Sequence, residues 1–334
     1  MPKIALVGDT HAGILSNKKI VERKTCEWFE NMFFPYIEKE NIKHIVHLGD
    51  LFHNRRAITT ESGKNVVDSI IKKIPKGVTW YQIIGNHDSF YNDSTEINSP
   101  YMIMGMHKNI VLVDGFLHVP ELQSDFYSWG KAPNETIKGK YAFGHWDIIG
   151  CMMNNLVMSD KGFNKEIFDS YHTCFSGHYH NNTKIGNVHY VGSPIEQSFN
   201  EIDSEHFFYV FDTDTGNIEK IKTDIKIFEK VEYFKDGPDR DIDIKDKVLK
   251  VYIMEDVDQL KFNKWRDSLE EKGLIDIKIV DKNKGNDEND DIIEDIENKS
   301  LIELMQEYID NHFTEGKEIM KKLMIKIHEE SLED

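Results

Sequence analysis

The strongest constraint on the fold is a regular alternation of apolar runs and amphipathic stretches in the first 84 residues. Short apolar runs at 3–8, 43–48 and 80–84 are typical of buried strands. The stretches between them, 17–40 and 60–74, carry apolar residues at helical spacing. This β-α-β-α-β order predicts a layered α/β fold.

Beyond about residue 108 the helical patterns thin out, and short apolar runs indicate further strands near 110–113, 126–129, 141–144, 187–192 and 207–211. A second unit is expected after the turn at Asp236-Gly237-Pro238, with strands at 248–254 and 275–281 around a helix at 257–272. We therefore predict four parts: a main domain (1–224), a small βαβ capping domain (225–281), an acidic linker (282–298) and a C-terminal helical pair (299–334).

Charge and cysteine content narrow the classes of function. The formal net charge is −18, and residues 281–334 alone hold 17 acidic and 7 basic residues. Such a chain is poorly suited to binding nucleic acid by bulk electrostatics without help. No apolar stretch approaches the ~20 residues that span a bilayer, and residues 1–11 show no cleavable leader. Three cysteines, too few for a disulfide framework, favour a reducing cytoplasm.

Polar residues of the kinds that bind metals follow several of the expected strands. In Asp-x-His and His-x-His, alternate side chains of an extended segment point the same way, and a glycine beside each group allows a sharp turn. The carboxyl ends of strands form the ligand crevice in layered α/β folds. Together these groups predict a metal site: Gly8-Asp9-Thr10-His11, Gly49-Asp50, Gly85-Asn86-His87-Asp88, Gly144-His145 and Gly177-His178-Tyr179-His180.

The order of these groups resembles that of the calcineurin-like metallophosphoesterases over about residues 4–195. The resemblance implies a layered β-sandwich core flanked by helices, and two divalent metal ions that share one carboxylate. One ion would be held by Asp9, His11, Asp50 and His180, and the other by Asp50, Asn86, His145 and His178. Mixed oxygen and imidazole ligands favour Mn²⁺, with Fe²⁺ or Zn²⁺ possible and an all-Mg²⁺ site less suitable. Such an ion pair activates water and neutralises phosphoryl oxygens.

Three further residues near these groups are candidates for catalytic roles. His87 follows a predicted ligand and is suited to position a phosphate or protonate a leaving oxygen, although it could be a structural histidine. Asp88 could orient His87 or simply cap the next turn. His53, in Gly49-Asp50-Leu51-Phe52-His53, matches a histidine that supports exonuclease action in the SbcD/Mre-type DNA-repair nucleases, although it could merely begin a helix.

The surrounding segments resemble the SbcD/Mre-type nucleases in particular. The Gly192-Ser193-Pro194 stretch after the last ligands is similar to theirs, while 141–146 and 304–309 are similar to the nuclease subunits of T-even-type bacteriophage recombination complexes. This resemblance implies a DNA exonuclease and single-strand endonuclease for end processing, recombination and double-strand break repair, in the bacterial host cytoplasm if the chain is phage-encoded. The alternatives are a phosphoesterase of the same fold acting on small phosphodiesters or phosphoproteins, and a catalytically silent scaffold.

The resemblance also implies partners. Nucleases of this type work with an SMC-like ATPase of the SbcC/Rad type, and residues 299–330 present apolar stripes that could dock on it or form a hairpin on their own domain. DNA would be the substrate. Met102, Ile103, Met104 and Met106 could join the 60–74 helix in a homodimer, or belong to the core.

Overall fold

The computed structural model describes residues 2–13, 19–91, 94–133, 138–152 and 158–282, together with Ile309, Lys317, Met320 and Leu323. The chain forms two compact units that divide between Phe228 and Glu229. The predicted linker and most of the predicted helical pair lie outside the described residues. No helix among the described residues is both long and apolar enough to cross a membrane.

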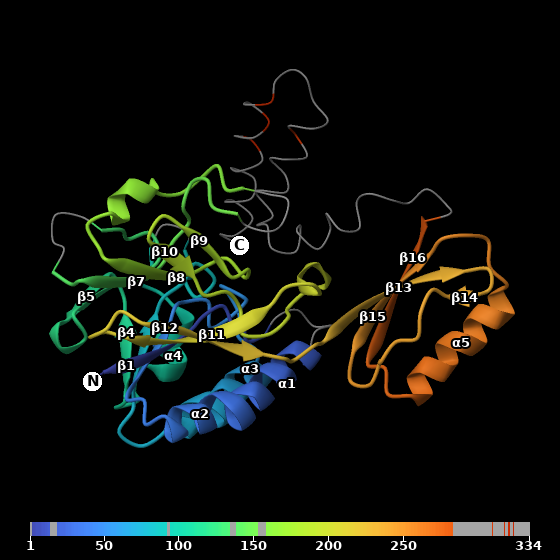
Figure 1. Cartoon of the computed structure of the whole chain (residues 1–334), viewed down its shortest axis with the longest axis horizontal. Helices are drawn as coiled ribbons and strands as arrows, with labels where there is room; N and C mark the ends of the chain where they lie inside the picture. The colour runs from blue at the N-terminus through green and yellow to red at the C-terminus, as the bar shows by residue number, and fades with distance from the viewer. Residues whose placement is uncertain are drawn as a thin grey trace. The chain divides into compact units, whose positions relative to one another are not determined.

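The larger unit contains two six-stranded sheets (Figure 1). The first has the order β12-β11-β1-β2-β3-β4, with strands β1 (Lys3–Val7), β2 (His44–His47), β3 (Thr79–Ile83), β4 (Ile110–Val113), β11 (His206–Asp212) and β12 (Ile218–Thr223). The second has the order β5-β6-β7-β8-β10-β9, with strands β5 (Phe116–Val119), β6 (Ser124–Tyr127), β7 (Tyr141–His145), β8 (Thr173–Gly177), β9 (Thr183–Ile185) and β10 (Val188–Tyr190).

One apolar core joins the two sheets into a sandwich. Leu6 and Val46 of the first sheet belong to the same buried cluster as Phe143 and Phe175 of the second. Strands β1 to β4 run parallel, and β6, β7, β8 and β10 also run parallel, so the chain leaves several neighbouring strands at the same end of the sandwich. The predicted layered β-sandwich is therefore confirmed.

Helices cover the outer face of the first sheet. These are α1 (Lys19–Trp28), α2 (Phe34–Lys39) and α3 (Thr60–Asn65), and Figure 1 shows them together on one side of the strands. The helix α4 (Ser99–Met104) precedes β4. Rings of Trp28 and Phe33 pack on Phe208 of β11. The outer face of the second sheet instead packs against Trp146, which follows β7, and Phe168 of the 3₁₀ turn Lys165–Phe168.

The two long helices predicted at 17–40 and 60–74 are each interrupted. A π-helical turn, Phe29–Phe33, separates α1 from α2, and a second one, Val66–Ile70, follows α3 and leads into the 3₁₀ turn Ile71–Lys73. In the first case the cause is visible, because Pro35 has no N–H to donate to the preceding turn. Apolar spacing alone does not distinguish these helix types.

Strand prediction was incomplete in the second half of this unit. The predicted strand at 126–129 is β6, Ser124–Tyr127. Strands β5, β8, β9 and β12 were not predicted. Edge strands such as β12, with sequence IEKIKT, carry polar residues on one face and give a weak apolar signal.

The smaller unit has its own sheet and core. The strand order is β14-β13-β15-β16, with β13 (Phe228–Phe234), β14 (Gly237–Pro238), β15 (Val248–Ile253) and β16 (Asp276–Asp281). The helix α5 (Gln259–Glu271) connects the parallel strands β15 and β16, as the predicted βαβ pattern requires. Its first turn is capped by Asp258, whose side chain accepts hydrogen bonds from the amides of Leu260 and Lys261.

Candidate metal centre

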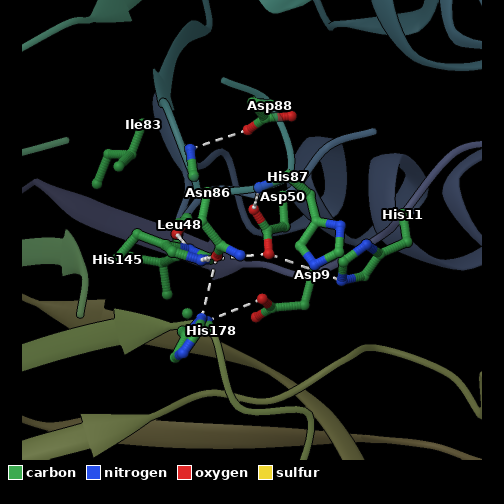
Figure 2. A network of polar contacts seen from close by, with 12 residues as sticks. Asp9, His11, Leu48, Asp50, Ile83, Asn86, His87, Asp88, His145 and His178 are labelled. Atoms are coloured by element: carbon green, nitrogen blue, oxygen red, sulfur yellow. Dashed lines mark hydrogen bonds and ion pairs between the residues drawn. The ribbon is translucent and has the colours of Figure 1, made fainter. Parts of the chain in front are cut away.

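The predicted ligands come together at the carboxyl ends of five strands. Asp9 and His11 follow β1, Asp50 follows β2, Asn86 follows β3, His145 ends β7, and His178 and His180 follow β8. Figure 2 shows most of them converging around the Asp50 carboxylate. Two groups have possible ligand atoms that all lie within 4.8 Å of one another: Asp9, His11 and His180, and Asp50, His145 and His178.

Asp50 lies between the two groups. Its Oδ2 atom is 3.2 Å from His145 Nε2 and 3.8 Å from His11 Nε2. Its Oδ1 atom accepts a hydrogen bond of 2.8 Å from the amide of His87, which fixes the carboxylate in this position (Figure 2). A single carboxylate so placed can serve two cations at once.

The backbone at these residues is held in an unfavourable conformation. Asp9, His11, Asp50 and His178 have φ angles of 52°, 44°, 53° and 91°, in the left-handed region. Such residues typically cost about 1–3 kcal/mol each and cluster at functional sites. Four of the seven non-glycine residues with positive φ in the described chain are therefore predicted ligands.

Two glycines allow the loops to approach this closely. Gly49 has φ +102°, and a Cβ atom there would lie 2.4 Å from His145 Nδ1. At Gly85 a Cβ atom would lie 2.2 Å from Asp50 Oδ1. Gly49 thus supplies both conformation and space, whereas Gly85 supplies space alone.

Asp9 is a buried carboxylate whose surroundings suit a bound cation. Asp9 Oδ1 accepts a hydrogen bond from the His178 amide at 2.8 Å, while Oδ2 is buried without a hydrogen-bond partner among the described residues. Burial, together with the charge of Asp50, raises the pKa of Asp9 to about 7. A buried carboxylate oxygen with no donor is costly unless a cation compensates it. The site therefore fits bound divalent metal.

Each of two histidines is oriented by a partner on its remote nitrogen. His145 Nδ1 donates to the carbonyl oxygen of Leu48 at 2.8 Å, which leaves Nε2 facing Asp50. His180 Nδ1 lies 3.0 Å from Glu201 Oε1, which leaves Nε2 3.1 Å from His11 Nε2. Partners of this kind fix the tautomer that binds a metal.

Electrostatics differ among the histidines. Burial lowers the pKa of His178 to about 3 and holds that of His11 well below its usual range, so both are neutral and able to ligate. Burial also acts to lower the pKa of His145, but the charge of Asp50 outweighs it and raises the value to about 9. Burial would raise the pKa of Asp50, yet His145 and His87 hold it well below its usual range.

Asn86 completes the second group. The end of its amide lies 2.8 Å from His145 Nε2 and 3.1 Å from His178 Nδ1. An amide oxygen at this position would face the same point as the two ring nitrogens. The indole of Trp129 packs against His178, with ring centroids 5.1 Å apart.

The three predicted catalytic residues lie beside the groups but contact different atoms. His87 Nδ1 donates to the carbonyl oxygen of His53 at 2.7 Å. His53 Nδ1 is 3.4 Å from His11 Nδ1, on the side of that ring away from His180. His11, His53 and His87 form a third cluster of ring nitrogens, which shares His11 with the first group.

Asp88 does not make the contact with His87 that the sequence suggested as one alternative. Its Oδ1 accepts a hydrogen bond from the Phe52 amide and its Oδ2 one from the Gly85 amide, both at 3.0 Å. Figure 2 shows it turned away from the histidine cluster. Both amides belong to residues that precede Asp88, so its side chain ties two ligand-bearing loops together. A catalytic role for Asp88 stays a prediction.

Sequence reasoning missed Glu201 and Gln197. Glu201 lies in a 3₁₀ turn, Phe199–Glu201, and is buried beneath His180. The side chain of Gln197 donates to the carbonyl oxygen of Asp9. Both follow the Gly192-Ser193-Pro194 stretch, whose similarity to the SbcD/Mre-type nucleases is the sequence signal that points to this region.

The Calcineurin-like phosphoesterase family model matches residues 2–323. The chain belongs to this family. It is 26% identical over 319 residues to "Exonuclease subunit 1" of Enterobacteria phage T4, covering 92% of each chain. An archaeal phosphodiesterase structure matches 66% of this chain and 99% of its own, at 13% identity and a TM-score of 0.34. A dimetal phosphatase from Danio rerio matches 63% and 91%, at 13% identity and a TM-score of 0.39.

Proposed function

We propose that this metallophosphoesterase is a two-metal-dependent DNA nuclease, an exonuclease on duplex ends and an endonuclease on single strands. The observation that carries the proposal is the Asp50 carboxylate between two groups of ligand atoms, beside the unpartnered Oδ2 of Asp9. The name of the phage T4 relative, an exonuclease subunit, supports the choice of a nucleic acid over small phosphodiesters. The sequence-predicted ligand sets are retained, with Mn²⁺ as the favoured ion.

The roles of the side chains follow from their contacts. When bound, two divalent ions supply an activated water and neutralise phosphoryl oxygens. Asp50 would be a ligand shared by both ions. Because His87 donates from Nδ1 to His53, a neutral His87 ring carries its lone pair on Nε2. Burial lowers the pKa of His87, and a nearby phosphate would favour the protonated form, so that Nε2 could pass a proton to the leaving oxygen.

The direct test is digestion of end-labelled duplex and single-stranded DNA with Mn²⁺, alongside bis-p-nitrophenyl phosphate. We expect cleavage of all three by the wild-type chain and of none by Asp50→Ala. Cleavage of the small diester without any cleavage of DNA would favour another phosphoesterase of the same fold. A protein that binds metal and cleaves nothing would be a scaffold.

We also propose that the chain works as the nuclease subunit of a complex with an SMC-like ATPase in DNA end processing, recombination and double-strand break repair. The word "subunit" in the relative's name supports a partner. The proposed docking segment, 299–330, lies mostly outside the described residues; of its apolar residues, Leu323 is exposed and Ile309 is buried. Leu304→Asp with Leu323→Asp in the full chain should abolish co-purification with the ATPase and stimulation by it, and unchanged affinity would refute this docking site.

A homodimer is proposed from the exposed apolar side chains of and beside α4. Met104 is buried, as the core alternative requires, but Met102 and Met106 are 80% and 99% exposed and Tyr101 is also exposed. Ile103 lies beside α3, within 3.6 Å of a Cβ atom built at Gly63. Light scattering should give twice the monomer mass for the wild type and the monomer mass for Met102→Glu; a monomeric wild type would refute the dimer.

A further inference from the structure

A hollow of about 350 Å³ opens at one edge of the sandwich, separate from the metal centre. Strand β9 is the edge of the second sheet and β12 is the edge of the first, and residues of both line the hollow. Its lining residues are Asn182, Thr183, Lys184, His189, Ile218 and Lys220.

The hollow is cationic. Lys184 and Lys220 are both exposed, and in the part of the chain that the structure describes neither has a carboxylate oxygen within 4 Å. Lys222, two residues along β12, is by contrast paired with Glu205 at 2.9 Å. Burial lowers the pKa of His189 to about 4, and the two lysines contribute in the same direction. In a chain of net charge −18, what distinguishes Lys184 and Lys220 is that both line one hollow.

One of the two ammonium groups is held in place. Lys220 Nζ donates to Asn182 Oδ1 at 2.6 Å and lies 5.3 Å from the ring centroid of Tyr209. The Asn182 amide is itself fixed, because it donates to the carbonyl oxygen of Val191 at 3.0 Å. An ammonium group has three donors, so Lys220 retains donors for a ligand in the hollow.

Strand registers place the hollow close to the metal centre. Thr183 pairs with Tyr190, which pairs with Ser176, two residues before His178. On the other sheet, Lys220 pairs with Tyr209, which pairs with Leu6, three residues before Asp9.

Each edge strand is thus two strands away from one that leads to a metal ligand. At a strand spacing of about 4.8 Å, the sideways separation is roughly 10 Å, and the step of two or three residues along the strand adds to it. Each DNA strand carries one phosphate per about 3.4 Å of helix axis, and neighbouring phosphates lie further apart than that in space, so the hollow is within a few nucleotides of the metal centre.

We propose that this hollow binds a backbone phosphate of the DNA strand, a few nucleotides from the bond that is cleaved, through Lys184 and Lys220. The inference rests on the proposed nuclease function and adds to it a place where the substrate is held. The nuclease chain, although its net charge is −18, would then contact the DNA backbone itself.

The test is the salt dependence of DNA binding by the full chain carrying Lys184→Gln and Lys220→Gln. The matched control carries Lys43→Gln and Lys76→Gln, two exposed lysines at the opposite ends of the parallel strands β2 and β3. The Kd for an end-labelled 20-bp duplex is measured from 50 to 200 mM salt with Ca²⁺ in place of Mn²⁺. We expect a Kd about tenfold higher at low salt and a log–log slope shallower by about one, with no change in the control.

Further measurements distinguish failure of the proposed nuclease function from failure of the phosphate contact in the hollow. If the wild type cleaves bis-p-nitrophenyl phosphate but neither binds nor cleaves DNA, the proposed function fails. If it cleaves DNA and the two double variants bind alike, only the hollow is refuted. Weaker inhibition by dAMP with unchanged duplex Kd would place a released mononucleotide there, and would also refute the strand contact. Lys220→Arg in the otherwise wild-type chain should bind the duplex as tightly as the wild type, because it keeps the positive charge. If the double variant is unstable, the single variant Lys184→Gln replaces it in the same measurement.

Discussion

Replacing Glu201 by Gln should lower the affinity of the protein for one of the two metal ions and leave the affinity for the other unchanged. Glu201 Oε1 lies 3.0 Å from His180 Nδ1, and Oε2 accepts a hydrogen bond of 2.9 Å from the Gln197 amide. Burial would raise the pKa of Glu201, but the bond to His180 outweighs it and lowers the value, so the group is ionised. A glutamine removes that charge and leaves an NH₂ group facing either a ring N–H or a backbone N–H.

The expected magnitude follows from the position of Glu201 behind a ligand. Loss of such a partner typically reduces metal affinity about 10- to 100-fold, equivalent to roughly 1.4–2.7 kcal/mol. The loss should fall on the ion assigned to His180, because His145 has its own partner in the Leu48 carbonyl group.

Calorimetric titration of the metal-free protein with Mn²⁺ can resolve the two affinities. The matched control is Glu205→Gln, an exposed glutamate on the following loop that pairs with Lys222. An equal loss of affinity for both ions, or no loss for either, would refute the assigned role of Glu201. Thermal unfolding of the metal-free variants, compared with the wild type, shows whether a general loss of stability accounts for the change.

Other predictions address the centre directly. Asp50→Ala should bind neither ion tightly, because one carboxylate serves both groups; two tightly bound ions by elemental analysis would contradict this. His87→Ala should keep both ions and lose about 100- to 10,000-fold in cleavage rate, the usual contribution of a general acid or base, so near-normal cleavage by the fully metallated variant would exclude that role. His53→Ala should reduce digestion of duplex ends more than cleavage of single strands. Equal loss on both substrates, with weaker metal binding, would instead indicate that it acts by supporting the ring of His11.

The sequence alone determined the residue types and the local elements. Apolar period identified strands such as β1 and β2 and the βαβ order of β15, α5 and β16, because period is a property of adjacent residues. Polar ligand-type residues at strand ends indicated a metal site before any geometry was known. The same local patterns could not separate α from π turns at Phe29–Phe33, where a proline and tertiary packing decide the hydrogen bonding.

Only the tertiary structure decided which distant residues meet. A single apolar core, to which Leu6 of the first sheet and Phe175 of the second both belong, brings residues 9 and 178 into contact across the sandwich. The same packing buries Glu201 beneath His180 and places Lys184 and Lys220 around one hollow. Such contacts join segments far apart in the chain. They depend on the shape and burial of whole layers, which no short sequence window contains.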